Sequence, residues 1–166
     1  MDSGEELVII VDEENNEVGV LPRKKMRAGR LPHRATYILV FNPQDELYVQ
    51  KRTQSKDVFP GYYDVAAGGV VLAGESYEEG ALRELEEELG IRGTPLKELF
   101  DFYYQDEYIT LWGRVFSCVY DGELVLQEEE VESGEYMQAE EVFRLAETES
   151  FTPDCLHVLQ RYLGQQ

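Results

Sequence analysis

Apolar residues along this chain gather mainly into short runs with the two-residue alternation or continuous hydrophobicity of β-strands. LVIIVDEENNEVGVL predicts two short strands joined by a turn at Glu14-Asn15-Asn16. ATYILVFN (35–42) is strongly apolar and ELYVQKR (46–52) alternates, so this pair predicts a hairpin in the middle of a sheet. Further strands are expected over 64–71, 98–105, 108–120 and 123–127, with Asp121-Gly122 as the turn between the last two.

Helical periodicity is clearest between Ser76 and Gly90, which are a predicted N-cap and C-terminal stop. Glu79 completes a capping box with Ser76, and Leu82, Leu85 and Leu89 form the expected core-facing stripe. Shorter helices are expected over residues 22–30, 138–147 and 153–163. These elements predict a single mixed α+β domain over residues 1–166.

Composition agrees with a globular domain, since 43% of the 166 residues are hydrophobic. No apolar run approaches the roughly 20 residues that span a bilayer, so we expect no membrane association. The acidic start MDSGEELVII lacks the basic region of a secretory signal. Cys118 and Cys155 lie in apolar contexts without metal-type spacing, which indicates buried free thiols and a cytoplasmic location.

The net charge of −19 argues against a nucleic-acid polymer as partner. Residues 21–56 are an exception, with nine basic side chains against two acidic ones. This local excess predicts attraction of a small anion, for which we favour Arg34, Lys51 and Arg52 as substrate-binding residues. The basic cluster over residues 23–30 is either part of that anion site or a solubilising helix surface.

The stretch RELEEELG carries four glutamates in five positions, although like charges at i,i+4 repel each other. On a helix, Glu84, Glu87 and Glu88 share one face, and Glu86 points elsewhere. Their carboxylates are the ligands that Mg²⁺ or Mn²⁺ accepts. A solvated face of an acidic protein is the alternative explanation of the same run.

GVVLAGESYEEGALRELEEELGI resembles the Nudix box at every fixed position, from Gly69 through Glu75 and Arg83 to Gly90 and Ile91. This resemblance implies an α/β/α sandwich with a mixed β-sheet, in which the box forms a loop-helix-loop. It also implies metal-dependent hydrolysis of a small-molecule diphosphate, such as a nucleoside diphosphate derivative, with Mg²⁺ or Mn²⁺ as cofactor. The protein would act as a monomer or a homodimer, which the sequence leaves open.

The same resemblance implies a role for each matching position. The expected metal ligands are Glu84, Glu87, Glu88 and the carbonyl of Gly68, with Glu84 alternatively acting as the base. Arg83 would orient the carboxylates, and Glu75 would support the loop or the metal. A further acid from outside the box is also expected, with these candidates: Asp106, Glu107, Glu128, Glu129 and Glu130.

A second resemblance, carried by VDEENNEVGV, LPHRATYILVFNPQDELYVQKR and KDVFPGYYDV, is to isopentenyl-diphosphate isomerase. The isomerase's catalytic cysteine falls at Gly68 and a metal-binding histidine at Val70, while the expected glutamates fall near Ile109 and Leu111. Only His33 matches a metal histidine, and it is alternatively a structural residue. We therefore expect a hydrolase of the isomerase-like branch, with an isomerase or a non-catalytic diphosphate sensor as alternatives.

The aromatic residues near the end of the predicted sheet leave one further choice open. They either wall a pocket that stacks a base or belong to the core: Phe102, Tyr103, Tyr104 and Trp112.

Overall fold

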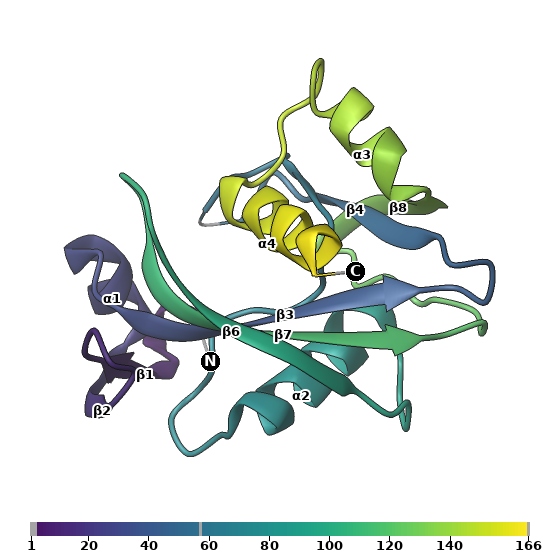
Figure 1. Ribbon diagram of the computed structural model, residues 1–166. Helices are drawn as coiled ribbons and strands as arrows, with labels where there is room; N and C mark the ends of the chain where they lie inside the picture. The colour runs from purple at the N-terminus through teal and green to yellow at the C-terminus, as the bar shows by residue number, and fades with distance from the viewer. Residues whose placement is uncertain (1–2, 57, 166) are drawn as a thin grey trace.

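The computed structural model describes residues 3–56 and 58–165, which form a sheet with helices on both of its faces (Figure 1). A short 3₁₀ turn, η1 (Ser3–Glu5), precedes the first strand. The strands are β1 (Leu7–Val11), β2 (Glu17–Pro22), β3 (His33–Phe41), β4 (Leu47–Arg52), β5 (Tyr63–Asp64), β6 (Lys97–Gln105), β7 (Thr110–Val119) and β8 (Val131–Met137). The helices are α1 (Arg23–Gly29), α2 (Tyr77–Leu89), α3 (Ala139–Leu145) and α4 (Pro153–Gly164).

The sheet is mixed, because β3 runs parallel to β7 while the other strand pairs are antiparallel. One part has the order β2-β1-β3-β7-β6, and β4 pairs with β5 and β8 in the other. The two parts meet where Phe41 pairs with Leu47. The expected hairpin of β3 and β4 is therefore short, and the two strands diverge beyond it to leave a cleft.

The alternation of β3 explains why both faces of the sheet are covered. Ala35, Tyr37 and Leu39 belong to the core shared with α4, whereas Ile38 and Val40 belong to the core shared with α2. In Figure 1, α4 lies over one face and α2 over the opposite face. The expected α/β/α sandwich is confirmed.

Two expected strands are wrong or incomplete. Residues 123–127 form no strand, because Val125 N–H donates to the carbonyl of Leu89 (2.9 Å) and Gln127 N–H donates to that of Glu88 (3.0 Å). These bonds satisfy carbonyls at the end of α2 that the helix itself leaves unpaired. Over 64–71, regular pairing ends with β5, and isolated bridges follow because Gly68 adopts φ +137°.

The core-facing stripe of α2 also needs correction. Leu85 and Leu89 are buried as expected, but Leu82 is 41% exposed. Ala81 takes its place in the core, one residue earlier on the helix. Cys118 and Cys155 are buried free thiols, as predicted. Among the described residues, no helix has the length and apolar character needed to cross a membrane.

Replacing Leu85 with alanine is expected to lower the free energy of unfolding by about 2–5 kcal/mol, because it leaves a cavity under α2. Leu82→Ala on the same helix is the matched control and should change it by only about 0.5 kcal/mol. Urea denaturation of both variants measures the difference. Equal losses would mean that burial against the sheet does not distinguish the two leucines.

Candidate active site

Capping interactions fix the two ends of α2, the helix that carries the glutamates. The hydroxyl of Ser76 accepts from Glu79 N–H (3.1 Å), and the Glu79 carboxylate accepts from Ser76 N–H (3.0 Å). At the other end, Gly90 adopts φ +69°, a left-handed conformation that terminates the helix. The face carrying Glu84 and Glu88 consequently lies against the glycine pair that precedes the loop into α2.

Arg83 binds three carboxylates and one backbone carbonyl. Its Nε and Nη2 donate to the two oxygens of Glu75 at 2.6 and 3.0 Å. Its Nη1 donates to Glu84 (2.8 Å) and Glu87 (3.3 Å), and Nη2 also reaches the carbonyl of Val70 (3.3 Å). The orienting role expected for Arg83 and the loop-supporting role expected for Glu75 would use these contacts, and both roles stay predictions.

These hydrogen bonds set the charge on Glu75. Burial raises its pKa, but the bonds from Arg83 and from Leu72 N–H outweigh burial, and the pKa lies below its usual value. Its hydrogen bonds therefore favour the ionised form of Glu75, which ties the loop before α2 to the helix.

Glu84 and Glu88 are in the opposite situation. Burial raises the pKa of Glu88 well above its usual value, and the negative charge of Glu84 raises it further. Burial also raises the pKa of Glu84, although Arg83 partly opposes this. The hydrogen bonds that Glu88 receives from the described residues are long, from Gln50 Nε2 (3.3 Å) and Gly68 N–H (3.4 Å). The pair carries more buried negative charge than its neighbours neutralise.

These carboxylates line a polar cavity of about 470 Å³, which we call the box cavity. Its walls comprise Glu6, Arg23, Ser55, Lys56, Gly68, Gly69, Arg83, Glu84, Glu87, Glu88, Glu129 and Glu130. Carboxylate oxygens suit a hard divalent cation, and such an ion would neutralise the buried charge of Glu84 and Glu88. No three acidic, histidine or cysteine side chains of the described residues are placed to hold a metal together, and Arg83 donates to both Glu84 and Glu87.

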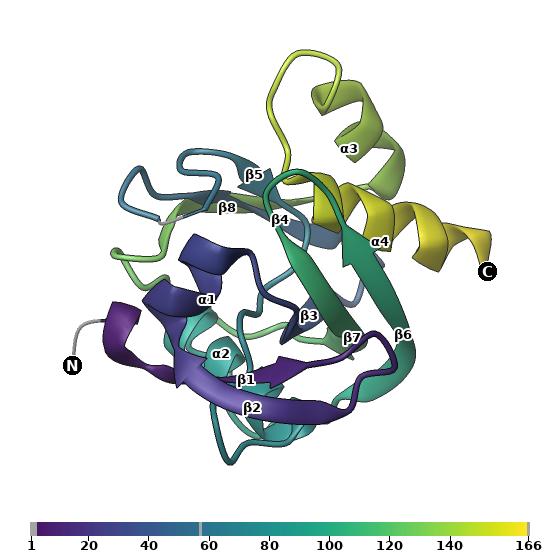
Figure 2. The same ribbon diagram turned by 90° about the vertical axis from the view of Figure 1, so that its left-hand side faces the viewer.

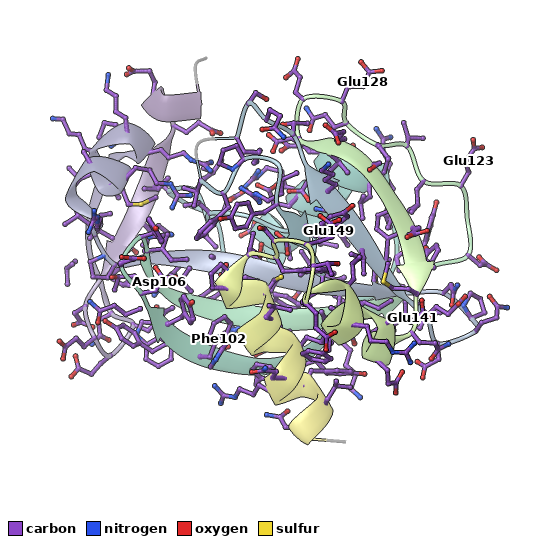
Figure 3. The ribbon with its side chains drawn as sticks, turned by 90° about the horizontal axis from the view of Figure 1, so that it is seen from above. Phe102, Asp106, Glu123, Glu128, Glu141 and Glu149 are labelled. Atoms are coloured by element: carbon purple, nitrogen blue, oxygen red, sulfur yellow. The ribbon has the colours of Figure 1, made fainter. Side chains whose placement is uncertain are left out.

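The structure separates the candidates for a further acid. Glu129 and Glu130 line the box cavity, and Glu130 forms an ion pair with Lys56, which lines it too. Asp106 instead accepts from the N–H groups of Tyr108 (2.7 Å) and Ile109 (2.9 Å) in the turn between β6 and β7. In Figure 3, Asp106 and Glu128 lie on widely separated sides of the molecule. Neither Glu107 nor Glu128 lines the box cavity.

A second, narrower cavity of about 90 Å³ continues from the box cavity, and we call it the inner cavity. The two share Arg23, Lys56, Gly68 and Gly69. The lining of the inner cavity includes residues of α1, β3, the end of β4 and the β4–β5 loop. Figure 2 shows α1 and the β4–β5 loop on the same side of the molecule. Any group bound in the inner cavity would therefore adjoin the carboxylates of the box.

Of the three expected anion-binding residues, only Arg52 reaches these cavities. It lines the inner cavity and donates to the carbonyls of Val58 (2.8 Å) and Phe59 (3.3 Å). Arg34 instead donates to the side chain and carbonyl of Asn15, both at 2.9 Å, in the β1–β2 turn. Lys51 pairs with Glu132 (3.4 Å) at the surface of the β4–β8 pair.

Sequence reasoning did not select the two cations that line both cavities, Arg23 and Lys56. Both belong to the basic excess over residues 21–56, which was the available signal. All four side chains, Arg23, Lys56, Arg34 and Lys51, are cations. Only the tertiary structure could therefore show which of them line a cavity.

The positions compared with the isomerase line the inner cavity, but most of them lack the side chains that isomerisation needs. Gly68, Val70, Ile109 and Leu111 all line it. A Cβ on Gly68 would collide with the carbonyl oxygen of Thr36, and φ +137° also disfavours any side chain there. His33 is 2% exposed, and its Nδ1 lies 3.0 Å from the carbonyl of Leu31.

The aromatic residues considered for base stacking lie mainly in packed positions. Phe102 is buried beneath α4 in the core with Tyr37, and Tyr104 packs against the same core. The ring of Tyr103 packs at a tilt against that of Trp112, with their centroids 5.7 Å apart. None of the four lines the box cavity or the inner cavity.

A fold of this topology with a glutamate-rich helix against a glycine turn defines a Nudix domain, and comparison with known proteins agrees. The NUDIX domain family model matches residues 31–158. An uncharacterized Nudix hydrolase of Yersinia pestis is 49% identical over 158 residues, covering 95% of this chain and 86% of that protein. Another from Pseudomonas aeruginosa is 46% identical over 161 residues, covering 97% and 95%.

Solved structures show the same fold. The crystal structure of DR0079 from Deinococcus radiodurans aligns with a TM-score of 0.83 at 27% identity, covering 94% of this chain and 98% of that one. The Nudix domain of Shewanella oneidensis NrtR, solved with ADP ribose, aligns at 0.65 with 16% identity, covering 80% and 89%, and shows the fold alone. The chain belongs to the Nudix family and is a Nudix hydrolase. This family hydrolyses phosphoanhydride-type bonds in small molecules and generally uses divalent metal ions.

Replacing Glu88 with glutamine is expected to stabilise the metal-free protein by on the order of 1 kcal/mol at neutral pH, because it removes a buried charge. The folded-state pKa of Glu88 lies above its usual value of 4.5, so folding binds a proton between the two values. Wild-type stability should therefore fall as pH rises above about 4.5, and the variant should fall less.

Thermal unfolding from pH 4.5 to 8, in EDTA and then with Mg²⁺, measures both effects. Mg²⁺ should raise the melting temperature of the wild type more than that of Glu88→Gln. Identical pH profiles for the two proteins would contradict the buried repulsion between Glu84 and Glu88.

Proposed function

We propose that the protein hydrolyses the phosphoanhydride bond of a nucleoside diphosphate derivative or a related small diphosphate, using Mg²⁺ or Mn²⁺. The observation that carries this proposal is the shared cavity wall of Glu84, Glu87 and Glu88 with Arg23 and Lys56. Carboxylates attract a divalent cation, and the cations opposite them attract phosphate, so the two charge types complement a metal-bound diphosphate.

Each box residue then has a distinct task. Glu87, Glu88, Glu84 and the carbonyl of Gly68 would hold the metal, which supplies charge neutralisation and an activated water when bound. Arg83 keeps Glu84 and Glu87 in position and would yield one of its contacts on metal binding, since it now occupies both carboxylates. Glu84 remains the alternative choice for the base, because its pKa is raised.

The basic side chains at the junction of the two cavities would hold the phosphate groups. Arg23 and Lys56 border both cavities, and Arg52 borders the inner cavity. Glu130, which pairs with Lys56, is the leading candidate for the further acid because it also raises the pKa of Glu88 and Glu84. Arg34 and Lys51 have no direct part in this arrangement.

An isomerase is a weaker candidate for the same fold. Its cysteine and histidine positions are occupied by Gly68 and Val70, and its expected glutamates fall near Ile109 and Leu111. Restoring a cysteine at Gly68 would force apart the adjoining backbone at Thr36. A non-catalytic sensor needs neither Arg83 nor the full carboxylate set, so the intact network favours turnover over binding alone.

Phosphate and nucleotide release from a panel of diphosphate compounds tests the proposal directly. We expect turnover of one compound class with Mg²⁺ or Mn²⁺ and none in EDTA. Turnover that persists in EDTA would contradict the metal site. Tight binding of a diphosphate without product, in the presence of metal, would favour the sensor.

Replacing Glu87 with glutamine should lower turnover about 100-fold, because it removes one metal ligand and one partner of Arg83. Glu86→Gln is the matched control on the same helix, since Glu86 pairs with Arg92 at 2.8 Å on the opposite, solvent side. Steady-state rates at saturating Mg²⁺ compare the two. A Glu87→Gln enzyme as active as Glu86→Gln would show that the ligand assignment is wrong.

A further inference from the structure

The inner cavity holds a second group of acids that the proposed hydrolysis does not use. Asp64, at the end of β5, and Asp154, in the first turn of α4, both line it. Burial raises the pKa of Asp64 to about 6; Arg52 opposes this shift, and the negative charge of Asp154 adds to it. Burial likewise raises the pKa of Asp154. The two carboxylates thus face a common space with more acceptor capacity than their neighbours use.

The hydrogen bonds of this pair come from few donors. Asp64 accepts from Ala66 N–H at 3.2 Å, weakly from Arg52 Nη1 at 3.5 Å, and from the thiol of Cys155, which is a weak donor. Asp154 accepts from the hydroxyl of Tyr37 at 2.6 Å. An ionised carboxylate has about four acceptor sites, so both acids retain capacity for further donors.

An independent observation at the same place comes from Thr152, which is 2% exposed and also lines the inner cavity. Its hydroxyl finds no oxygen or nitrogen hydrogen-bond partner among the described residues. A side-chain hydrogen bond with Thr152 lowers the pKa of the nearby Cys155 thiol, but a thiol is only a weak partner for a hydroxyl. A buried hydroxyl without a partner costs stability, which a bound polar group would recover.

The size and charge of the cavity restrict what could bind there. Its volume of about 90 Å³ is smaller than the roughly 150 Å³ of an engineered cavity that binds benzene, which favours a group smaller than an aromatic base. Arg23, Arg27, Arg52 and Lys56 also line it, and their positive charge disfavours an ammonium group. A small neutral group with several O–H donors fits both limits.

We propose that the inner cavity binds a hydroxyl-bearing group of the substrate, the end of a polyol or sugar, through Asp64, Asp154 and Thr152. This inference rests on the proposed function, because it identifies the group attached to the diphosphate. The phosphate would lie at Arg23 and Lys56, and the hydroxyl groups would reach inward past Arg52.

Three phosphate esters of similar length test the assignment without requiring hydrolysis. Glycerol 1-phosphate carries hydroxyl groups, propyl phosphate carries none, and 3-aminopropyl phosphate carries an ammonium group. Calorimetric titration of the full chain with Mg²⁺ gives a dissociation constant for each. We expect glycerol 1-phosphate to bind at least about tenfold more tightly than propyl phosphate, as for hydrogen bonds to charged groups.

Thr152→Val and Asp154→Asn test whether the preference for glycerol 1-phosphate over propyl phosphate arises in the inner cavity. Both should remove most of this preference while leaving propyl phosphate binding unchanged. Thr152→Val is the sharper variant, because removing an unpartnered buried hydroxyl should preserve or raise the melting temperature while it lowers the affinity for glycerol 1-phosphate. Thr110→Val is the matched control, since Thr110 is 7% exposed on β7 and does not line the cavity.

Equal affinity for the three esters, or no binding of any, would overturn the proposal, as would tightest binding of 3-aminopropyl phosphate. A preference that survives Thr152→Val and Asp154→Asn would also overturn it. If Asp154→Asn does not fold, Thr152→Val alone decides. Because these esters contain no phosphoanhydride bond, the two proposals fail separately: selective binding of glycerol 1-phosphate with no turnover in the diphosphate panel would fault the proposed reaction, and turnover in that panel without selectivity among the esters would fault this site.

Discussion

The guanidinium group of Arg83 is the interaction on which the rest of the site depends. It joins Glu75 in the loop before α2 to Glu84 and Glu87 on the helix, and it also binds the carbonyl of Val70. Without this cation, three carboxylates would lie together with little to oppose their repulsion. Arg83 thus lets a helix carry more negative charge than it could otherwise tolerate, and it keeps that charge facing the cleft.

A backbone constraint complements this electrostatic one. Gly68 lies so close to Thr36 that no side chain fits, and a Cβ on Gly69 would come within 2.9 Å of a Glu84 oxygen. The glycine pair therefore brings bare backbone against both β3 and the carboxylates of α2. Because β3 and β4 separate beyond Phe41 and Leu47, the same backbone borders the cleft. The backbone at Thr36 thus leaves no room for a cysteine at Gly68. Without that cysteine, the site favours hydrolysis over isomerisation.

The cleft arranges opposite charges along its length. Carboxylates of α2 line only the box cavity, Arg23 of α1 and Lys56 of the β4–β5 loop line both cavities, and Asp64 and Asp154 line only the inner cavity. A substrate that matches this order would place phosphate near the middle and hydroxyl groups inside. The two proposals thus describe successive parts of one molecule, whose phosphoanhydride bond would lie at the metal site proposed for the box.

The sequence by itself determined the features that depend on local spacing. Capping by Ser76 and Gly90, the shared face of Glu84 and Glu88 and the buried strands follow from helical and strand periodicity, which neighbouring residues define. The family also followed from the spacing of the box, and its matching positions, from Glu75 to Glu88, do lie together. Leu82 was misplaced because a 3.6-residue period leaves two adjacent positions, Ala81 and Leu82, as alternatives for one turn of the stripe.

Only the tertiary structure decided which distant residues share a cavity. Arg34 and Arg52 are alike in sequence context, yet one closes the β1–β2 turn and the other lines the cleft. Residues 123–127 were expected to be a strand, but they serve the free carbonyls of α2 instead. Asp64 and Asp154 are 90 positions apart, and no local pattern connects them. Such pairings depend on how the sheet divides and how α4 packs on it, and long-range packing of this kind leaves no periodic signal in the chain.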